Sequence, residues 1–191
     1  MPMIRETIVS TVDGQGQVHL APLGIIAEDA GWIIAPFRPS KTLDNLAVVP
    51  FAVANFTDDV RIFAGSLTGR RDWPTAACER FAVPRLAGAL AHAELAVTHR
   101  TDDEQRPRFH CRVLRTTSHA PFQGFNRAQA AVIEAAILVS RLPMLPREKV
   151  EREIAYLEIA VGKTAAAAEQ EAWTWLTQAI RAFYTGAQRS K

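Results

Sequence analysis

The chain carries, between two apolar runs, the stretch Pro36-Phe37-Arg38-Pro39-Ser40-Lys41-Thr42-Leu43-Asp44-Asn45-Leu46. The cations Arg38 and Lys41 and the hydroxyls Ser40 and Thr42 come directly before a helix-like Leu-x-x-Leu. Because the first turn of a helix exposes N–H groups, such a loop suits an anion, most of all a phosphate. The competing interpretation is an ordinary capped turn with exposed cations, and the loop by itself does not decide between them.

The residues before this loop predict three strands in a meander. β-branched residues dominate 4–12, Asp13-Gly14 is a hairpin signal, and further strand-like runs cover 18–27 and 32–35. Pro22 and Gly24 interrupt the second run. This indicates an edge strand or a bulge, where another backbone or a flat ligand can approach closely.

The residues after the loop predict more strands around short helical segments. A short helix over 43–48, capped by Thr42 or Ser40 and ended by Pro50, leads to a buried strand over 51–56. Then come a helical or extended turn over 60–67 and an irregular stretch over 68–88. Strands follow over 90–101 and 108–113. Together these runs favour an antiparallel β-barrel or sheet with short helical fillers.

From Asn126 onward the apolar pattern takes the helical period. Three amphipathic helices are expected: one from an Asn126 cap to about residue 142, one over 147–161 and one capped by Thr164 and running to 186. Gly162 and Gly186 are interpreted as stop signals for the second and third. The predicted fold class is α+β, mainly β, with a barrel domain over 1–122 and a three-helix extension over 123–191.

Composition excludes several classes of function. The 191 residues carry 22 Lys and Arg against 20 Asp and Glu, without the basic excess of a nucleic-acid-binding protein. Cys78 and Cys111 lie far apart with no Cys-x-x-Cys pair, so neither a disulfide framework nor a metal site is expected. The chain shows no signal peptide and no apolar run of about 20 residues. We therefore expect a soluble cytoplasmic protein with no membrane partner.

Other polar residues offer weaker candidate sites. Asn55 and Thr57 follow a buried strand and can reach the candidate anion site formed by the loop over 38–42. A plain polar turn is the commoner explanation of these two residues. Arg108, His110 and Arg112 share one face of a strand, which forms either an anion-contacting wall or a solvated face. The Gly-x-Ser-x-Gly motif of α/β-hydrolases is absent, and no catalytic residue is assigned.

An ordered set of motifs resembles one family. The motifs are Arg-Glu-Thr-Ile-Val-Ser-Thr (5–11), Ala-Pro-Leu-Gly (21–24), Pro-Phe-x-x-Ser-Lys-Thr-x-x-Asn-Leu (36–46) and Ala-Asn-Phe-Thr-Asp-Asp (54–59). They are similar, over nearly the whole chain, to an uncharacterised family with the FMN-binding split-barrel fold, related to flavin reductases and pyridoxamine-phosphate oxidases. The resemblance implies a split barrel, FMN as the cofactor and a homodimer with FMN in a groove between its subunits.

The resemblance also implies which residues hold FMN. The loop and short helix would bind the phosphate, the early strand would carry the isoalloxazine ring, and two residues after the buried strand would lie near the ring or ribityl chain. In that order, the implied residues are Arg38, Ser40, Lys41, Thr42 and Asn45; His19, Ala21, Pro22, Leu23 and Gly24; Asn55 and Thr57.

The implied function is that of an FMN-dependent oxidoreductase acting on an unknown small substrate. Hydride or electrons would pass through the flavin, so no protein nucleophile is needed. His19 and His110 are the candidate proton donors. Some members of the family are associated with tetrahydromethanopterin-linked one-carbon metabolism. The alternative is a non-catalytic module that binds flavin or senses a ligand.

Overall fold

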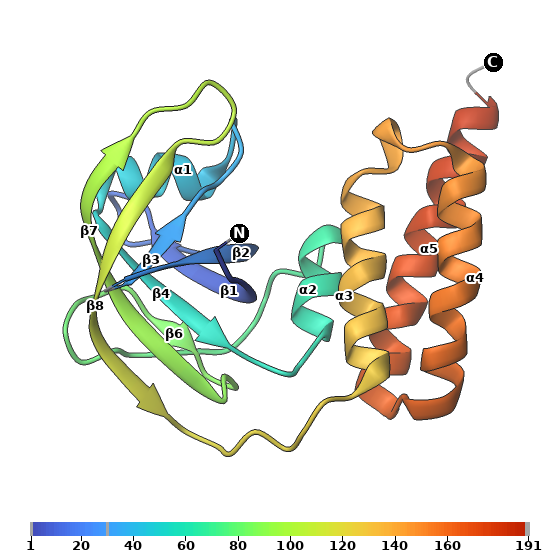
Figure 1. Ribbon diagram of the computed structural model, residues 1–191. Coiled ribbons are helices and arrows are strands. Elements are labelled where there is room, and N and C mark those ends of the chain that lie inside the picture. The colour runs from blue at the N-terminus through green and yellow to red at the C-terminus, as the bar shows by residue number, and fades with distance from the viewer. Residues whose placement is uncertain (1, 30, 190–191) are drawn as a thin grey trace. The chain divides into compact units, whose positions relative to one another are not determined.

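The structure is a computed structural model that describes residues 2–29 and 31–189 (Figure 1). It divides into two compact units: Met1–Thr57 with Trp73–Phe122, and Asp58–Asp72 with Gln123–Lys191. We call them the barrel unit and the helical unit. The chain passes from the barrel unit to the helical unit between residues 122 and 123. Residues 58–72 group with the helices, which the sequence did not indicate.

Antiparallel strands close the barrel in the order β1-β2-β3-β8-β7-β4. Their bounds are Ile4–Val12 (β1), Val18–Glu28 (β2), Gly31–Ile34 (β3), Phe51–Phe56 (β4), Ala91–Thr101 (β7) and Arg108–Ser118 (β8). The barrel closes where Ile8–Ser10 pair with Val53–Asn55. The predicted antiparallel barrel is confirmed, and its last strand continues to Ser118 instead of ending at residue 113.

The hairpin between β1 and β2 forms at the predicted Asp13-Gly14 signal. The Asp13 carboxylate accepts hydrogen bonds from the backbone N–H groups of Gln15 and Gln17, at 3.0 and 2.9 Å. Gly16 adopts a positive φ of 79°, which a residue with a side chain rarely takes. The turn fixes a register in which Val12 faces Val18.

Alternate residues of the strands and one face of a helix build the barrel core. The helix is α1 (Lys41–Val48), which begins and ends close to the predicted bounds. It packs two leucines against residues from all six strands of the barrel. The buried cluster includes Leu43 and Leu46 of α1 together with Val9, Ile25, Ile34, Ala54, Leu95 and Phe109. This packing seats the start of α1 against the barrel.

An irregular segment covers part of the outer surface of the barrel. It contains the two short strands β5 (Thr75–Ala76) and β6 (Arg85–Leu86), which pair with each other. Val83 is 1% exposed and clusters with Val12 and Val53 on this outer side. The part of the predicted irregular stretch that belongs to the barrel unit, residues 73–88, therefore has a defined place as a cover over β1 and β4.

The helical unit contains α2 (Arg61–Leu67), α3 (Arg127–Ser140), the short 3₁₀ helix η1 (Leu142–Met144), α4 (Arg147–Thr164) and α5 (Ala167–Arg189). Figure 1 shows α3, α4 and α5 side by side. Their shared core includes Val60, Ala64, Val132, Ala135, Val161, Trp173 and Leu176. No helix among the described residues combines the length and apolarity needed to cross a membrane.

Two of the predicted helix ends are wrong. α4 continues through Gly162 to Thr164, and α5 continues through Gly186 to Arg189. A glycine inside a helix costs only about 1 kcal/mol relative to alanine, so it does not by itself end a packed helix.

The helix starts follow the capping chemistry more closely. Asn126 caps α3 as predicted, because its side-chain oxygen Oδ1 accepts from the backbone N–H of Ala128 at 2.8 Å. Thr164 does not cap α5. Its hydroxyl accepts from the same Ala128 N–H, and α5 is capped by the Glu169 carboxylate, which accepts from Ala166 N–H at 2.9 Å.

Gly31 gives a sharp test of the barrel. A Cβ atom there would lie 1.9 Å from the carbonyl oxygen of Cys111 on β8. We expect Gly31→Ala to force β3 and β8 apart and to lower the free energy of unfolding by about 3 kcal/mol or more, as severe overpacking does. Urea denaturation followed by tryptophan fluorescence measures it.

Gly88→Ala is the matched control, because a Cβ there meets nothing within 4 Å. It is expected to change the free energy of unfolding by less than about 0.5 kcal/mol. Equal stability of the two variants would contradict the close approach of β3 and β8.

Candidate functional site

The loop before α1 ends in a well-formed helix cap. Ser40 has extended backbone angles (φ −157°, ψ 146°), and its hydroxyl accepts from the N–H of Leu43 at 3.3 Å. Of the two predicted caps, Ser40 is therefore the one used. Thr42 lies in the first turn and is only 2% exposed. Lys41 begins the helix with its side chain half exposed.

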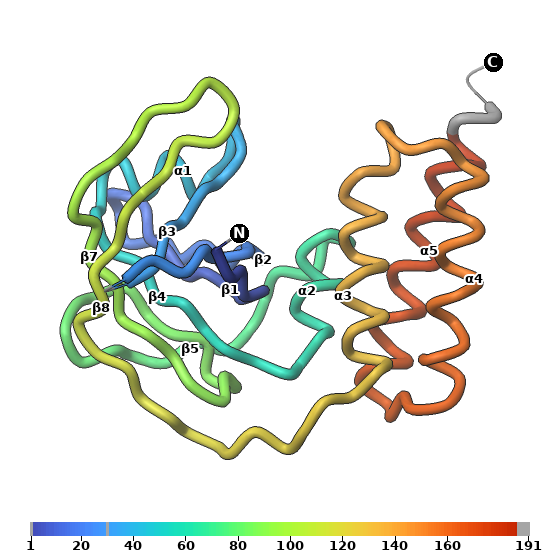
Figure 2. The backbone as a smooth tube through the Cα atoms, in the orientation of Figure 1, coloured from blue at the N-terminus to red at the C-terminus, as the bar shows by residue number. Residues whose placement is uncertain are grey.

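The turn between β7 and β8 holds this loop in place (Figure 2). The backbone N–H of Arg38 donates to the carbonyl of Gln105 at 2.9 Å. The Arg106 guanidinium donates to the carbonyl of Ala35 at 3.1 and 2.9 Å and lies 4.4 Å from the centroid of the Phe37 ring. The backbone of the loop is thus fixed by residues about 70 positions away, a contact that no local sequence pattern indicates.

The two cations of the loop form loose ion pairs, and the Nε atom of Arg38 also donates to the backbone carbonyl of Asp103 at 3.3 Å. Arg38 lies 3.6 Å from the Asp102 carboxylate and Lys41 lies 4.0 Å from that of Asp13. The two side chains are 39% and 49% exposed. Exposed pairs of this kind contribute roughly 0–1 kcal/mol, so either cation can turn to an anionic ligand at low cost.

Asp103 adds a fixed negative charge beside the loop. The backbone N–H groups of Arg106 and Gln105 donate to its carboxylate and hold its pKa below the ordinary value, and the charges of Arg108 and Arg38 act in the same direction. Arg108 therefore belongs to the surroundings of the loop. Arg112 faces Gly31 at the far end of β3, so the two arginines of the predicted wall lie in different places.

The third residue of the wall, His110, contacts three other side chains on the outer barrel surface. The Nδ1 atom of His110 lies 3.0 Å from the Glu28 carboxylate, and its Nε2 atom lies 3.2 Å from the Thr101 hydroxyl. The His110 ring also stacks on His99, with 4.0 Å between the centroids. Both ring nitrogens of His110 are occupied within the chain.

α1 and the start of β2 meet across β1. The side-chain amide of Asn45 donates to the Thr11 hydroxyl at 3.0 Å, and Thr11 is opposite His19 in the β1–β2 register. Asn45 is 3% exposed. Its observed contact is structural: it fixes α1 to β1 and so places the loop near the first residues of β2.

The five predicted ring-binding residues share one strand with a free edge. Among the described residues β2 pairs with β3 only through Ile26–Glu28, so Val18–Ile25 have a strand neighbour on one side alone. His19, Ala21 and Leu23 face the same side as core residue Val9, whereas Pro22 and Gly24 face the other. Of the two structures predicted at Pro22, an edge strand or a bulge, the edge strand is the one observed.

Asn55 is placed differently from the other candidates. It is 0% exposed. Its amide nitrogen donates to the Ile8 carbonyl at 2.8 Å and the Ser10 hydroxyl at 2.9 Å, and its oxygen accepts from Leu86 N–H at 2.7 Å. The structure gives this side chain internal partners on every side. Thr57, just past the end of β4, is partly exposed.

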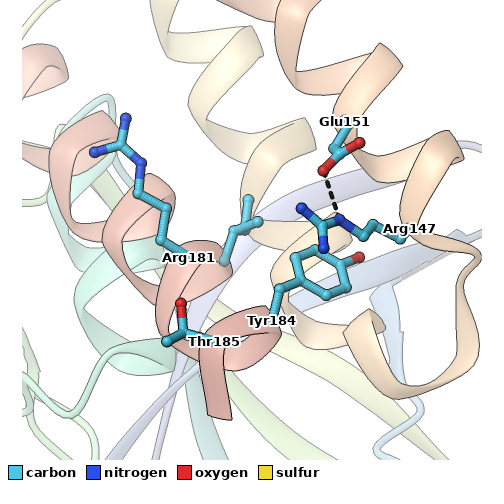
Figure 3. Close-up of a pocket in the computed structure, with 6 residues that line it drawn as sticks. Arg147, Glu151, Arg181, Tyr184 and Thr185 are labelled. Atoms are coloured by element: carbon cyan, nitrogen blue, oxygen red, sulfur yellow. Dashed lines mark hydrogen bonds and ion pairs between the residues drawn. The ribbon is translucent and has the colours of Figure 1, made fainter. Parts of the chain in front are cut away.

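A hollow in the helical unit includes none of the predicted site residues (Figure 3). Its lining includes Arg147, Glu151, Arg181 and Tyr184. Arg147 donates to Glu151 at 2.6 Å and lies 5.0 Å from the centroid of the Tyr184 ring, while Arg181 extends away from this pair. Of the two arginines that line the hollow, Arg147 is thus already paired within the chain.

Solved structures share this fold. The FMN-bound protein MM1853 from Methanosarcina mazei is 22% identical with a TM-score of 0.80, over 94% of this chain and 96% of that one. A putative flavin reductase with a split barrel domain from Shewanella frigidimarina is 13% identical with a TM-score of 0.52, over 65% and 74%. Flavoredoxin from Methanosarcina acetivorans is 14% identical with a TM-score of 0.51, over 62% and 69%.

No curated protein matches the chain. Residues 5–120 match the N-terminal domain of a family described as a protein of unknown function, DUF447, and residues 126–178 match the C-terminal part of the same family. The two matches cover the barrel and most of the three long helices. The chain therefore belongs to the DUF447 family, and its fold is that of the split-barrel flavoproteins.

Proposed function

We propose that the barrel unit binds FMN and that the protein is a flavin-reductase-like oxidoreductase. One observation carries the proposal: two exposed cations stand at the capped start of α1, next to the free edge of β2. A neighbour with the same fold along nearly its whole length is described as FMN-bound. The sequence predicts FMN as the ligand, and the geometry of the loop supports the same ligand.

The phosphate group of FMN fits the loop. It carries up to two negative charges and accepts several hydrogen bonds, which charged donors and N–H groups at a helix start supply. Arg38, Lys41 and the hydroxyl of Ser40 are the exposed or partly exposed donors of the loop. Thr42 and Asn45 are buried, so in this proposal they stabilise α1 and do not contact the phosphate. Arg108 adds positive charge nearby.

The isoalloxazine ring fits the free edge of β2. A strand edge presents alternating N–H and C=O groups, which match the donors and acceptors along the edge of the ring. His19, Ala21, Pro22, Leu23 and Gly24 all lie on this edge. Asn55, whose hydrogen bonds are all internal, supports the neighbouring strand in this proposal, and Thr57 stays a predicted contact.

A second copy of the chain would complete the groove. The outer face of β1 and β2 is apolar and partly exposed: Ile4 is 57% exposed, and Leu20, Pro22 and Ile26 are partly exposed on the same face. A homodimer that covers this face would bury the strip and shield the ring from water. Light scattering on the purified protein tests the dimer, and a monomer at all concentrations with FMN bound would contradict it.

Bound FMN would supply the redox chemistry, by taking up a hydride and passing electrons on. The chain would bind and orient it. Reduction by NAD(P)H under anaerobic conditions, seen as bleaching of the visible flavin band, distinguishes an oxidoreductase from a flavin carrier. A link to tetrahydromethanopterin-dependent metabolism stays a prediction that rests on the resemblance alone.

Replacing Lys41 tests the phosphate contact. We expect Lys41→Ala to raise the dissociation constant of FMN by about 10- to 100-fold, the usual cost of losing a hydrogen bond to a charged group. The affinity for riboflavin, which lacks the phosphate, should not change. Fluorescence titration measures both.

Lys163→Ala, at an exposed lysine near the end of α4, is the matched control and should leave both affinities unchanged. If Lys41→Ala weakens FMN and riboflavin equally, or neither, Lys41 does not contact the phosphate. If the wild-type protein takes up no flavin at all, the proposed function is wrong.

Asp13→Asn should strengthen FMN binding. The substitution keeps an oxygen that can accept from Gln15 and Gln17 but removes the charge that competes for Lys41. The expected gain is up to about 5-fold in affinity at low salt, the value of one exposed ion pair, and it should fade as the salt concentration rises. Asp29→Asn, at another exposed carboxylate of the barrel unit, is the control. An unchanged or weaker FMN affinity in Asp13→Asn would contradict the position of the phosphate.

A further inference from the structure

A second cluster of reactive side chains lies on the outer side of β7, apart from the loop before α1. His92 and Glu94 alternate with the core residues Ala93 and Leu95, so they point out of the barrel. They are nevertheless 4% and 0% exposed. The segment around β5 and β6 covers them: the backbone N–H of Arg80 donates to one oxygen of Glu94 at 2.9 Å.

The covering segment brings a thiol into the same place. The sulfur of Cys78, a ring nitrogen of His92 and a carboxylate oxygen of Glu94 all lie within 4.8 Å of one another. They come from two parts of the chain that are separated by 13 residues of sequence, counted from Cys78 to His92. The expectation of no metal site rests on the absence of a Cys-x-x-Cys pair, which takes no account of a cysteine that meets a distant histidine and glutamate.

Two atoms of this cluster are buried without a hydrogen-bond partner. Among the described residues, neither Nε2 of His92 nor Oε1 of Glu94 has one, and the two atoms lie 3.6 Å apart. Buried polar atoms without partners are rare in native proteins and call for an explanation. A direct hydrogen bond between the two side chains does not explain them, because 3.6 Å is longer than a hydrogen bond.

Together these atoms match the ligands of a zinc ion. Thiolate sulfur, imidazole nitrogen and carboxylate oxygen all bind Zn²⁺, at about 2.3, 2.0 and 2.0 Å. Tetrahedral geometry at those lengths places the nitrogen and the oxygen about 3.3 Å apart, close to the 3.6 Å found between His92 and Glu94. Small shifts of the Cys78 side chain would complete the set.

The other nitrogen of His92 has the support expected of a metal ligand. Its Nδ1 atom lies 2.8 Å from Nε2 of His119, and the two rings stack with centroids 5.0 Å apart. A histidine ligand normally has its second nitrogen fixed in this way by a neighbouring group. His119 therefore orients His92.

We propose that Cys78, His92 and Glu94 bind one Zn²⁺ ion, with His119 as the positioning residue and a water molecule at the fourth position. Binding replaces the thiol proton of Cys78, which is released to the solvent. The ion would fasten the covering segment to β7. This site is independent of the proposed flavin site and shares no residue with it.

Cobalt is the first probe, because a Co²⁺ ion bound by a thiolate gives a charge-transfer band in the near ultraviolet. The full-length protein, stripped of metal with a chelator, should take up one equivalent of Co²⁺ with this band and lose it when Zn²⁺ is added. Cys78→Ser should abolish the band, and Glu94→Gln should weaken Zn²⁺ binding at least 10-fold. His119→Gln should weaken binding but keep the band.

Cys111→Ser is the matched control, because Cys111 is the other free cysteine and lies in the barrel core. It should keep the band. Absence of a Co²⁺ band in the wild-type protein, or a band that survives Cys78→Ser, would overturn the proposal and leave His92 and Glu94 as a metal-free buried pair.

A measurement on the wild-type protein alone avoids the risk that a variant fails to fold. Zn²⁺ should slow the alkylation of Cys78 by iodoacetamide at least 10-fold, as followed by mass spectrometry of its peptide. The Cys111 peptide provides the internal reference and should react at the same rate with and without Zn²⁺. Equal rates at Cys78 with and without Zn²⁺ would overturn the proposal.

Discussion

The side-chain amide of Asn55 is the contact on which the barrel depends. It bonds to β1 at the place where β4 closes the barrel, and it accepts from the N–H of Leu86 in the covering segment. One buried amide thus joins the closure of the sheet to the cover over its outer surface. Removing it would leave a carbonyl and an N–H group buried without partners, at about 1–3 kcal/mol each.

The candidate flavin site depends on this frame. Closure of the barrel fixes β1, β1 holds α1 through Thr11 and Asn45, and α1 places Lys41 and the Ser40 cap. The turn between β7 and β8 fixes the same loop from the other side. The loop that offers exposed cations is therefore built on a rigid base, which is the arrangement that orients a charged ligand with little loss of entropy.

Much of the fold could be predicted from local patterns. The Asp13-Gly14 turn, the Ser40 and Asn126 caps and the alternation around Phe109 all rest on interactions within a few residues, which sequence spacing reveals. The helix end predicted at Gly162 is wrong, because helix packing outweighs the local preference of one glycine.

Features made by distant parts of the chain could not be found in this way. The family resemblance and the place of Asn55 at the end of a buried strand predict it as a contact of the ligand. Its partners at Ile8 and Leu86 lie 47 and 31 residues away. The hydrogen bonds from Arg106 to the Ala35 carbonyl and the proximity of Cys78 to His92 likewise join residues that are distant in the sequence. The topology of the fold determines such contacts, so the spacing of residues in one sequence does not predict them.

Pro22 in the free edge of β2 has a consequence for how the protein meets other chains. A strand edge with a full row of N–H groups would template the addition of a further strand, and proteins with such edges tend to aggregate. Proline has no N–H to donate, so it interrupts the row at the centre of the edge. A second chain can pack its side chains against β2 but cannot extend the sheet across it. The edge of β2 that we propose for the flavin ring is thereby protected against extension of the sheet by another chain.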